Sequence, residues 1–460
     1  MKPRLRLLLS FVLLAVLVGV VAFVPRIARA ATGPRTISGT LDNAPYLIDV
    51  PANWNGTLVL YSHGYVAPGQ PNPAADAGDP LTKQWLLSQG YALAGSAYSQ
   101  TGWAVQQAFQ DQMDLVDFFD QTIGQPTRTI AWGHSLGGII TAGLVQLFPN
   151  RFDAALPMCG VVSGGVATWN VALDSAFAFA TLLGNGTPLQ VVHITNPKAN
   201  LGLAESILSG AQGTAQGRAR FALAAALGDT PGWFSPTAPE PAPDDFAAQE
   251  ANQFLWDQQV DFPFVFALRA ELEFRAGGNP SWNAGVDYRT EFEHSANAGE
   301  VRALYQQAGL DLTTDLNTLQ NAPRIAADPN AVAYLNNYIT FNGNLAMPVL
   351  TMHTTGDGLV INQDEAAYAS VVRSQGNNAM LRETFVHRAG HCAFTPAETI
   401  TAFQSLISRL DTGQWGPLNV DDLNAAAASL GSTFNPLSPS FVQFQPTLYP
   451  RPFFAQDVSS

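Results

Sequence analysis

The chain is poor in lysine and in charged residues of either sign. Of its 460 residues, 13% are charged, and the lysines are Lys2, Lys83 and Lys198 alone. The formal net charge is −14 at pH 7. Such an acidic chain disfavours nucleic acid and anionic membranes as partners, and it suits an exported protein with a neutral substrate.

Beyond the N-terminus, the sequence has no apolar run long enough to span a bilayer. Within residues 1–30, three basic residues precede 18 uncharged, mostly apolar residues from Leu7 to Val24, and Ala28-Arg29-Ala30 follows as a small-x-small cleavage signal. We predict a secretory signal peptide over residues 1–30, with a retained membrane anchor as the alternative. No cysteine lies near the cut, which argues against a lipoprotein. Cleavage changes the formal charge from −14 to −19, because residues 1–30 hold five basic residues and no acidic one.

Cysteine is scarce as well, with Cys159 and Cys392 as the two examples. Both follow predicted strands, so both belong at the same edge of the predicted sheet. In an exported protein a lone pair of this kind is a disulfide candidate. The alternative is two separate small residues of the core.

Strands alternate with helices through most of the remaining chain, which predicts a mostly parallel sheet with helices on both faces. The expected strands are 46–50, 57–61, 91–97, 128–132, 154–159, 347–352 and 381–386. The expected helices are 81–89, 105–121, 138–145, 364–375 and 396–410.

The alternation stops near Ser163 and resumes at Met347. The intervening residues, about 180 of them, form too long a segment for a simple crossover. We predict that residues 163–346 are a lid subdomain over the carboxyl edge of the sheet, which leaves 31–162 and 347–410 as the core and 411–460 as a tail. The aromatic run Phe262–Phe266 is a candidate substrate wall, with the lid's own core as the alternative.

The pentapeptide Gly133-His134-Ser135-Leu136-Gly137 lies between a predicted strand and a predicted helix. A Gly-x-Ser-x-Gly sequence in this context is typical of a sharp turn that holds the serine hydroxyl exposed above a sheet. A serine needs a base to become a nucleophile, and the base needs an acid to orient it. The turn therefore predicts a nucleophile only if the chain also supplies these partners.

Two loops after later strands supply them. Asp357 lies in a glycine-flanked turn after the 347–352 strand, and His391 lies in a short loop after the 381–386 strand. The chain order Ser, Asp, His is the one that Gly-x-Ser-x-Gly hydrolases use. We predict that His391 exchanges the Ser135 proton and that Asp357 orients the imidazole.

The other histidines have weaker claims. His387 competes with His391 as the base, although it falls within or at the end of a strand. His193, His294 and His353 lack partners at ligand spacing, so we propose no metal site.

The oxyanion donors are expected from two backbone positions. One is the N–H of Leu136, directly after the nucleophile, and the other is the N–H of Tyr65, in the loop after the 57–61 strand. His63 would brace that loop. Tyr65, Trp103 and His134 are candidate substrate-binding residues, of which His134 is expected to pack rather than react.

The chain resembles the α/β-hydrolase superfamily. The resemblance rests on Gly133–Gly138, the His63-Gly64 loop, the Asp357 turn and the Gly390-His391 loop. The general pattern is similar to secreted, actinobacterial-type serine hydrolases of the esterase and lipase kind, with a large lid between the sixth and seventh strands. The resemblance covers about 44–162 and 347–410. It implies an eight-stranded sheet, a Ser135–Asp357–His391 triad and no cofactor.

The function expected from the sequence is secreted hydrolysis of carboxylic esters that carry an apolar or aromatic acyl group. The substrate would be a small or oligomeric ester, and no stable membrane association is expected after signal cleavage. A serine exopeptidase of the prolyl or tripeptidyl aminopeptidase type is an alternative, and so is an acyltransferase. The exopeptidase would need a lid carboxylate for a free amino terminus, for which the candidates are Glu271, Glu273, Glu291 and Glu293.

Overall fold

The computed structural model describes residues 33–454, and the predicted signal peptide lies outside them. One sheet contains nine strands in the order β1-β2-β4-β3-β5-β6-β7-β8-β9. The strands are β1 (Arg35–Leu41), β2 (Ala44–Val50), β3 (Thr57–Ser62), β4 (Ala92–Ser96), β5 (Arg128–His134), β6 (Ala154–Met158), β7 (Val349–Gly356), β8 (Leu381–Ala389) and β9 (Phe441–Val442).

The centre of the sheet, from β4 through β3, β5, β6 and β7 to β8, is parallel. β1, β2 and β9 are antiparallel to their neighbours. The prediction of a mostly parallel sheet is confirmed, but the expected number of eight strands is wrong. The two strands that sequence patterns missed are β1, an edge strand with largely exposed side chains, and β9, which has two residues.

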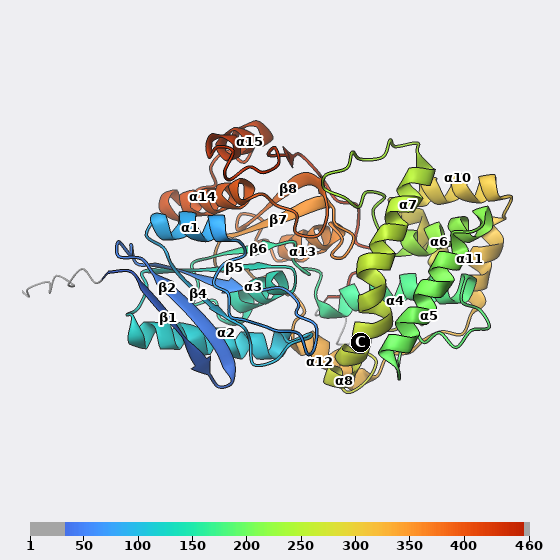
Figure 1. Ribbon diagram of the computed structural model, residues 1–460, viewed down its shortest axis with the longest axis horizontal. Coiled ribbons are helices and arrows are strands. Elements are labelled where there is room, and N and C mark those ends of the chain that lie inside the picture. Colours follow the sequence, from blue (N-terminus) through green and yellow to red (C-terminus); the bar gives the residue numbers. More distant parts are fainter. Residues whose placement is uncertain (1–32, 455–460) are drawn as a thin grey trace, which may run out of the picture.

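Helices cover both faces of this sheet, as predicted (Figure 1). One face packs against α2 (Val105–Thr122), α3 (Leu136–Leu147) and α13 (Gln363–Ser374). The other packs against α1 (Pro80–Ser88), α14 (Pro396–Thr412) and α15 (Val420–Ser429). Both layers contribute apolar residues to the core, and the loops with the candidate functional residues begin at the carboxyl edge of the sheet between them.

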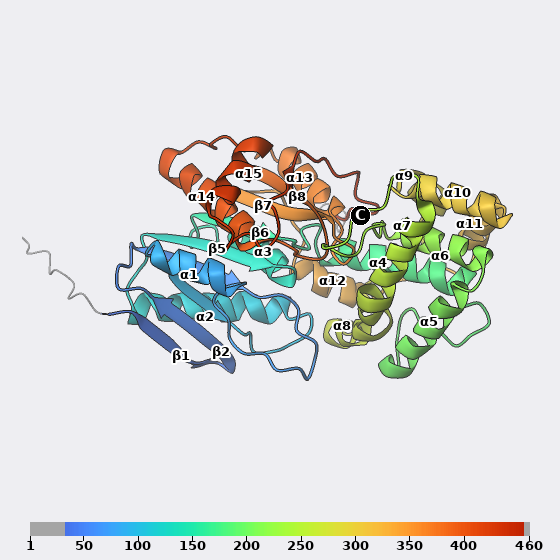
Figure 2. The ribbon, with the colours of Figure 1, turned by 45° about the horizontal axis from the view of Figure 1, so that its top comes forward.

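A block of helices is inserted in the chain between β6 and β7 and lies beside the sheet (Figures 1 and 2). We call it the helical insertion. Its elements are α4 (Gly165–Leu182), α5 (Pro197–Ala211), α6 (Ala215–Leu227), α7 (Phe246–Trp256), the π-helices η1 (Asp257–Asp261) and η2 (Phe264–Leu268), α8 (Arg269–Ala276), α9 (Tyr288–His294), α10 (Ala298–Ala308), α11 (Leu312–Asn321) and α12 (Pro329–Asn337).

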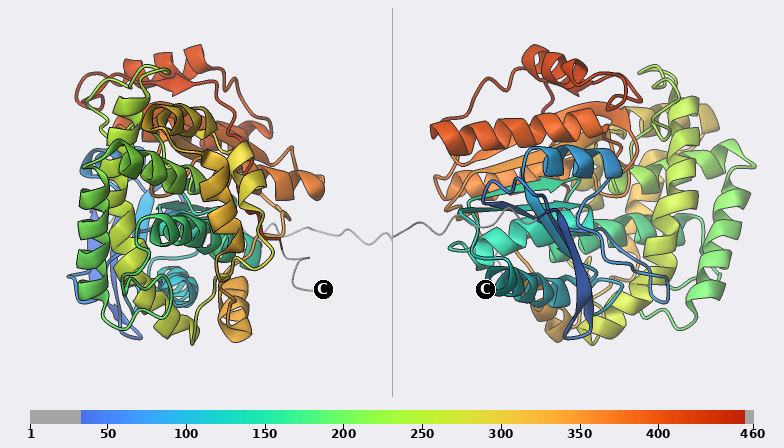
Figure 3. Two further views of the ribbon diagram at one scale, coloured as in Figure 1. Left: turned by 90° about the vertical axis from the view of Figure 1, so that its right-hand side faces the viewer. Right: turned by 60° about the vertical axis from the view of Figure 1, so that its left-hand side comes forward.

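The insertion has an apolar core of its own, which includes Phe179, Phe221 and Tyr305. Figure 3 shows the helices of the insertion grouped beside the sheet. The C-terminal segment then joins the two parts of the molecule. After β9 pairs with β8, Arg451 forms an ion pair with Asp174 of α4 at 2.6 Å and donates to the Trp282 carbonyl. None of the helices within residues 33–454 has the length and apolar character needed to cross a bilayer.

Candidate active site

Ser135 lies at the sharp turn between β5 and α3. Its φ is 58°, a left-handed conformation that is strained for a serine. The turn requires glycine on both sides, because a Cβ on Gly133 would lie 2.4 Å from the Gly137 carbonyl oxygen, and one on Gly137 would lie 1.9 Å from the Ser62 carbonyl oxygen. The two glycines therefore let β3, β5 and α3 approach each other closely enough to hold the serine in this position.

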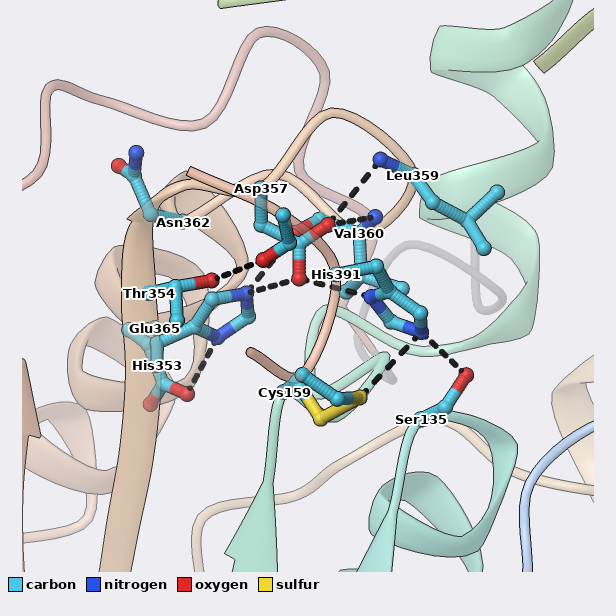
Figure 4. Close-up of polar contacts among 12 residues, drawn as sticks. Ser135, Cys159, His353, Thr354, Asp357, Leu359, Val360, Asn362, Glu365 and His391 are labelled. Atoms are coloured by element: carbon cyan, nitrogen blue, oxygen red, sulfur yellow. Dashed lines mark hydrogen bonds and ion pairs between the residues drawn. A yellow bond between two sulfur atoms is a disulfide. The ribbon is translucent and has the colours of Figure 1, made fainter. Parts of the chain in front are cut away.

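The structure brings His391 and Asp357 to this serine, although 256 and 34 residues of chain separate the paired groups (Figure 4). The Ser135 Oγ lies 2.7 Å from His391 Nε2, and His391 Nδ1 lies 2.7 Å from Asp357 Oδ2. A hydroxyl, an imidazole and a carboxylate in this order have the geometry for general-base activation of the hydroxyl.

Asp357 is completely buried and is held by its own turn. Its Oδ1 accepts hydrogen bonds from the backbone N–H groups of Leu359 and Val360, both at 3.1 Å. Burial alone would raise the pKa of this carboxyl, but the His391 and His353 imidazoles outweigh it and hold the pKa below its ordinary value. Asp357 is therefore a carboxylate at neutral pH.

The loops that carry Asp357 and His391 are fastened to each other. The Thr354 hydroxyl donates to the Gly390 carbonyl at 2.7 Å, and the Gly390 N–H donates to the Gly356 carbonyl at 3.0 Å. These bonds join the end of β7 to the loop after β8. The separation between His391 and Asp357 is thus fixed by hydrogen bonds between their loops as well as by their own hydrogen bond.

Cys159 and Cys392 form a disulfide that connects the end of β6 to the His391 loop. Cys392 Sγ lies 3.4 Å from His391 Nε2, so the bridge passes directly beside the imidazole (Figure 4). These three residues are also the group within residues 33–454 whose donor atoms are close enough to hold a metal ion. Because the two sulfurs are bonded to each other, they have no thiolate to offer to a metal.

His387, the alternative base, is exposed on β8 and does not approach Ser135. Its Nε2 lies 3.1 Å from Glu240, and its Nδ1 lies 3.2 Å from the Thr355 hydroxyl. It lies within β8, four residues before His391, and its contacts are with Glu240 and Thr355 rather than with Ser135. The loop histidine, His391, is the one that reaches the serine.

The expected oxyanion donors lie beside Ser135. The Leu136 N–H is the first of α3, where helix N–H groups have no partner within the helix. A Cβ on Gly64 would lie 3.4 Å from the Ser135 Cβ, which places the Gly64-Tyr65 peptide against the serine. His63 braces this loop, because its ring stacks on Tyr98 at 4.1 Å and the Tyr98 hydroxyl donates to the His63 carbonyl.

A cavity of about 100 Å³ opens at Ser135. Its walls are mainly apolar and aromatic, and they include Tyr65, Trp103, Trp169, Phe264, Val161 and Leu359. Two of the predicted substrate-binding residues, Tyr65 and Trp103, line it. Part of the wall comes from the core and part from α4 and η2 of the helical insertion.

His134, the third predicted substrate-binding residue, does not line this cavity. Its ring packs against Tyr61 and Trp132, with ring centroids 5.8 and 5.3 Å away. Burial, followed by the nearby His391, lowers the pKa of His134 to about 4, so the ring is neutral. Its proposed substrate contact is wrong, because the neighbour of an elbow serine points back into the core, whereas Ser135 points out of it.

The aromatic run Phe262–Phe266 serves both expected purposes. Phe262 and Phe266 are buried in the core of the insertion, where their rings pack against Phe179. Phe264, between them, lines the cavity and lies 5.0 Å from the Tyr65 ring. Residues two positions apart on a helix do not face the same side, so Phe264 points away from Phe262 and Phe266.

None of the four glutamates considered for an exopeptidase lines the cavity. Glu271 accepts from the Trp103 N–H at 3.0 Å and pairs with Arg275, so it fixes a wall residue rather than facing the space. Glu273 pairs with Arg269, and Glu293 with Arg302. Glu291 lies 3.8 Å from Arg451.

The carboxyl group that does reach the cavity is Asp261, in η1, which the sequence reasoning missed. A second chamber of about 80 Å³ continues past it, with Asp257, Thr230 and Tyr449 in its wall. Burial and then the Asp257 carboxylate raise the pKa of Asp261 well above its ordinary value, and burial raises that of Asp257 to about 7. Both carboxyls therefore favour the protonated form more than an exposed aspartate does. π-helical turns are frequent at functional sites, but no sequence pattern predicts the π-helix that carries Asp261.

Over 417 residues the chain is 31% identical to o-phthalyl amidase from Xanthobacter agilis, a match that covers 84% of this chain and 89% of that one. The chain belongs to the o-phthalyl amidase family. Residues 88–181, which include the Ser135 turn, also match the prolyl oligopeptidase family.

Solved structures resemble this member of the o-phthalyl amidase family more distantly. An acylaminoacyl peptidase from Pyrococcus horikoshii is 10% identical with a TM-score of 0.40, and the match covers 85% of this chain and 43% of the peptidase. A rice cell wall degrading esterase from Xanthomonas oryzae is 14% identical with a TM-score of 0.36, over 80% of this chain and 85% of the esterase. The chain has an α/β-hydrolase-like fold with a nine-stranded, mostly parallel sheet.

Proposed function

We propose that the protein is a secreted serine hydrolase that cleaves amides and esters of compact aromatic acyl groups. The observation that carries this proposal is the hydrogen-bonded series Ser135–His391–Asp357 beside a cavity with aromatic walls. Membership of the o-phthalyl amidase family supports it, since that relative is named for an amide with an aromatic acyl group. The function extends the ester hydrolysis expected from the sequence to amides.

The reaction proceeds by acyl transfer through the serine. His391 Nε2 takes the proton of the Ser135 hydroxyl while Oγ attacks the substrate carbonyl carbon, and the same nitrogen then gives that proton to the leaving oxygen or nitrogen. The bond to the leaving group breaks and an acyl-enzyme remains. Water, deprotonated by His391, attacks the acyl-enzyme, and the carboxylic acid is released as Ser135 regains its proton.

The Leu136 and Tyr65 N–H groups would bind the carbonyl oxygen as it becomes negative. Both belong to backbone that packing holds in place, so little reorganisation accompanies the charge change. Loss of one such donor costs about 3 kcal/mol of barrier in other enzymes. Asp357 stabilises the imidazolium that forms on the other side of the serine.

The size of the cavity favours compact acyl groups. An engineered apolar cavity of about 150 Å³ binds benzene, and the cavity at Ser135 measures about 100 Å³ with a further chamber of about 80 Å³ beyond Asp261. Together the two spaces have room for one aromatic ring with a short substituent, which favours such an acyl group over a long chain. We infer that the helical insertion acts as a lid, because α4, η1 and η2 supply part of the wall around this space.

A fluorophosphonate probe tests the nucleophile. Wild type should be labelled covalently, and Ser135→Ala should not. Ser429→Ala, which removes an exposed hydroxyl on α15, should be labelled like wild type. Equal labelling of wild type and Ser135→Ala would overturn the assignment.

Matched substrates test the acyl group and the bond. Hydrolysis of p-nitrophenyl benzoate should exceed that of p-nitrophenyl decanoate, and benzoyl-p-nitroanilide should also be cleaved. A preference for the decanoate would contradict the inferred pocket, and an intact anilide would restrict the activity to esters.

The cavity carboxyl also favours a second candidate, an exopeptidase that binds a free amino terminus. Asp261 and Asp257 have no cationic side chain among the residues lining either chamber, so an ammonium group would be their natural partner. This candidate predicts faster cleavage of aminoacyl-p-nitroanilides than of their N-acetyl derivatives, and loss of that preference in Asp261→Asn. Equal rates for free and blocked amines would exclude it.

The predicted signal peptide is the basis for secretion, and the disulfide supports it, since such bonds persist in oxidising compartments. Mass spectrometry of protein from the culture medium should give a chain that begins at Ala31. A chain that keeps residues 1–30 and remains with the membrane fraction would support the anchor instead.

A further inference from the structure

His353, near the end of β7, is a buried histidine to which the acyl-transfer chemistry assigns no part. Its side chain has no exposed surface. One ring nitrogen, Nδ1, lies 3.0 Å from Glu365 Oε1 of α13. The other, Nε2, lies 2.8 Å from the Val360 carbonyl oxygen and 3.6 Å from Asp357 Oδ2 (Figure 4).

These contacts favour the doubly protonated ring. A carbonyl oxygen can only accept, so Nε2 carries a hydrogen, and a carboxylate at Nδ1 is best satisfied by a second one. Burial by itself lowers the pKa of His353, but the hydrogen bonds and charges of Asp357 and Glu365 reverse this and raise the pKa to about 10. His353 is thus an imidazolium at neutral pH, between two carboxylates.

Few other charged groups act on this ring. Asp364, also on α13, is close enough to feel its charge, and its Oδ1 accepts from the Ser163 N–H. Glu383 of β8 lies beyond Glu365 and interacts with that carboxylate. His391 faces the opposite side of Asp357.

We propose that His353 is a positioning residue that keeps Asp357 ionised and aimed at His391. Asp357 Oδ2 lies between the two imidazoles, while its Oδ1 is fixed by the Leu359 and Val360 N–H groups. Charges therefore alternate along one buried line: Glu365 negative, His353 positive, Asp357 negative, and His391 positive when it takes the serine proton. This inference rests on the proposed function, because it assigns His353 a part in the same acyl-transfer site.

Because the charges alternate, His353→Gln and Glu365→Gln should move the acid limb of the kcat/KM pH profile in opposite directions. His353→Gln removes a positive charge, so protons bind more tightly at Asp357 and His391, and the acid limb of kcat/KM should move to higher pH. Glu365→Gln removes a negative charge and leaves the imidazolium unbalanced, so the limb should move to lower pH. A merely structural role for His353 would not produce shifts of opposite sign.

The experiment is the pH dependence of kcat/KM from pH 5 to 9 on an activated aryl ester. We expect a shift of about one pH unit upward for His353→Gln, which is about a tenfold loss on the acid limb, and a downward shift for Glu365→Gln. The double variant should return towards wild type. His387→Gln, which changes an exposed histidine outside the site, is the matched control and should leave the limb in place.

Folding of each variant is checked by circular dichroism and thermal unfolding. If His353→Gln does not fold, the downward shift in Glu365→Gln still tests the proposal. If both variants are active and the acid limb of kcat/KM stays in place, or moves in the same direction in both, the proposed role of His353 is overturned. The proposed function is not affected by that result. A wild-type protein with neither hydrolysis nor fluorophosphonate labelling would instead refute the proposed function.

Discussion

Asp357 is the residue whose charge the candidate site depends on most. In Asp357→Asn the amide cannot stabilise an imidazolium, and it allows the wrong His391 tautomer. We expect kcat to fall on the order of 10⁴-fold, as for the equivalent change in other triads. Hydrolysis of p-nitrophenyl benzoate at pH 8 measures the loss.

Asp364→Asn is a matched control for this change. Asp364 is buried like Asp357, and its Oδ1 accepts from the Ser163 N–H, a bond that the amide oxygen of asparagine also accepts. It should retain activity within a few-fold of wild type. Activity of Asp357→Asn within tenfold of wild type would refute the triad.

Ala172 of α4 controls the depth of the cavity, because it lines both chambers. Ala172→Leu adds three carbon atoms at this junction. We expect kcat/KM for p-nitrophenyl benzoate to fall at least tenfold and that for the acetate to change little, since buried volume rather than chemistry is altered. A parallel fall for both esters would mean that the acyl group does not occupy this space.

At the residue scale, sequence patterns identify those functional side chains whose position along the chain is set by the fold. Ser135, Asp357 and His391 were predictable because each lies in a short loop after a strand of a parallel sheet, and all such loops meet at one edge. Asp261 was not, because it lies in a helix of the insertion, whose orientation over the cavity depends on long-range packing. His353 was not, because a buried imidazolium and a neutral core histidine look the same in sequence.

At the element scale, the disulfide fastens the His391 loop to β6 and closes a chain segment of 233 residues. A closed loop of this length restricts the unfolded state, so the Cys159→Ala, Cys392→Ala double variant should lose about 2–5 kcal/mol of unfolding free energy. Because the bridge also braces the imidazole, we expect slower fluorophosphonate labelling at temperatures where the variant is folded. Urea unfolding and labelling rates measure the two effects.

Reduced wild type is the control for this variant, since dithiothreitol removes the bond but keeps both cysteines. It should behave like the double variant in both measurements. A variant as stable as oxidised wild type, and labelled as fast, would show that the backbone bonds between the Gly356 and Gly390 segments hold the loop unaided.

The strands and helices of the core were largely predictable, since their apolar patterns repeat with the period of each element. The differences are at the margins: β1 is exposed along most of its length, and β9 is too short for any pattern. The insertion was predictable only as a helical region. Its helices bury apolar residues against one another rather than against the sheet, so their order in space does not follow from the strand–helix alternation.

At the scale of the whole molecule, buried carboxyl groups dominate the expected pH dependence of stability. Burial raises the pKa of Asp229 to about 6, of Asp257 and Asp364 to about 7, and of Glu300 and Glu383 to about 8. Each such group retains its proton in the folded state over a pH range in which the unfolded chain has lost it. Stability from these groups is fully present below about pH 4 and is lost as pH rises to about 8.

His353 acts in the same direction at higher pH. Its pKa is raised to about 10 in the folded state, so its contribution is present below about pH 6.5 and is lost as pH rises through about 10. Asp49 and Asp357, whose pKa values lie below their ordinary values, oppose this only in acid, below about pH 4. The excess of negative charge adds self-repulsion as the pH rises.

We therefore expect the protein to be more stable at pH 5 than at pH 8, and urea unfolding midpoints between these values measure the slope. Glu300→Gln should flatten the slope, because the amide keeps the hydrogen-bonding contact with Gln253 and has no proton to lose. Glu293→Gln, at an exposed carboxylate paired with Arg302, is the matched control and should leave the slope unchanged. A urea midpoint that rises from pH 5 to pH 8 would contradict this prediction. It would mean that the buried carboxyl groups are already ionised in the folded protein at pH 5.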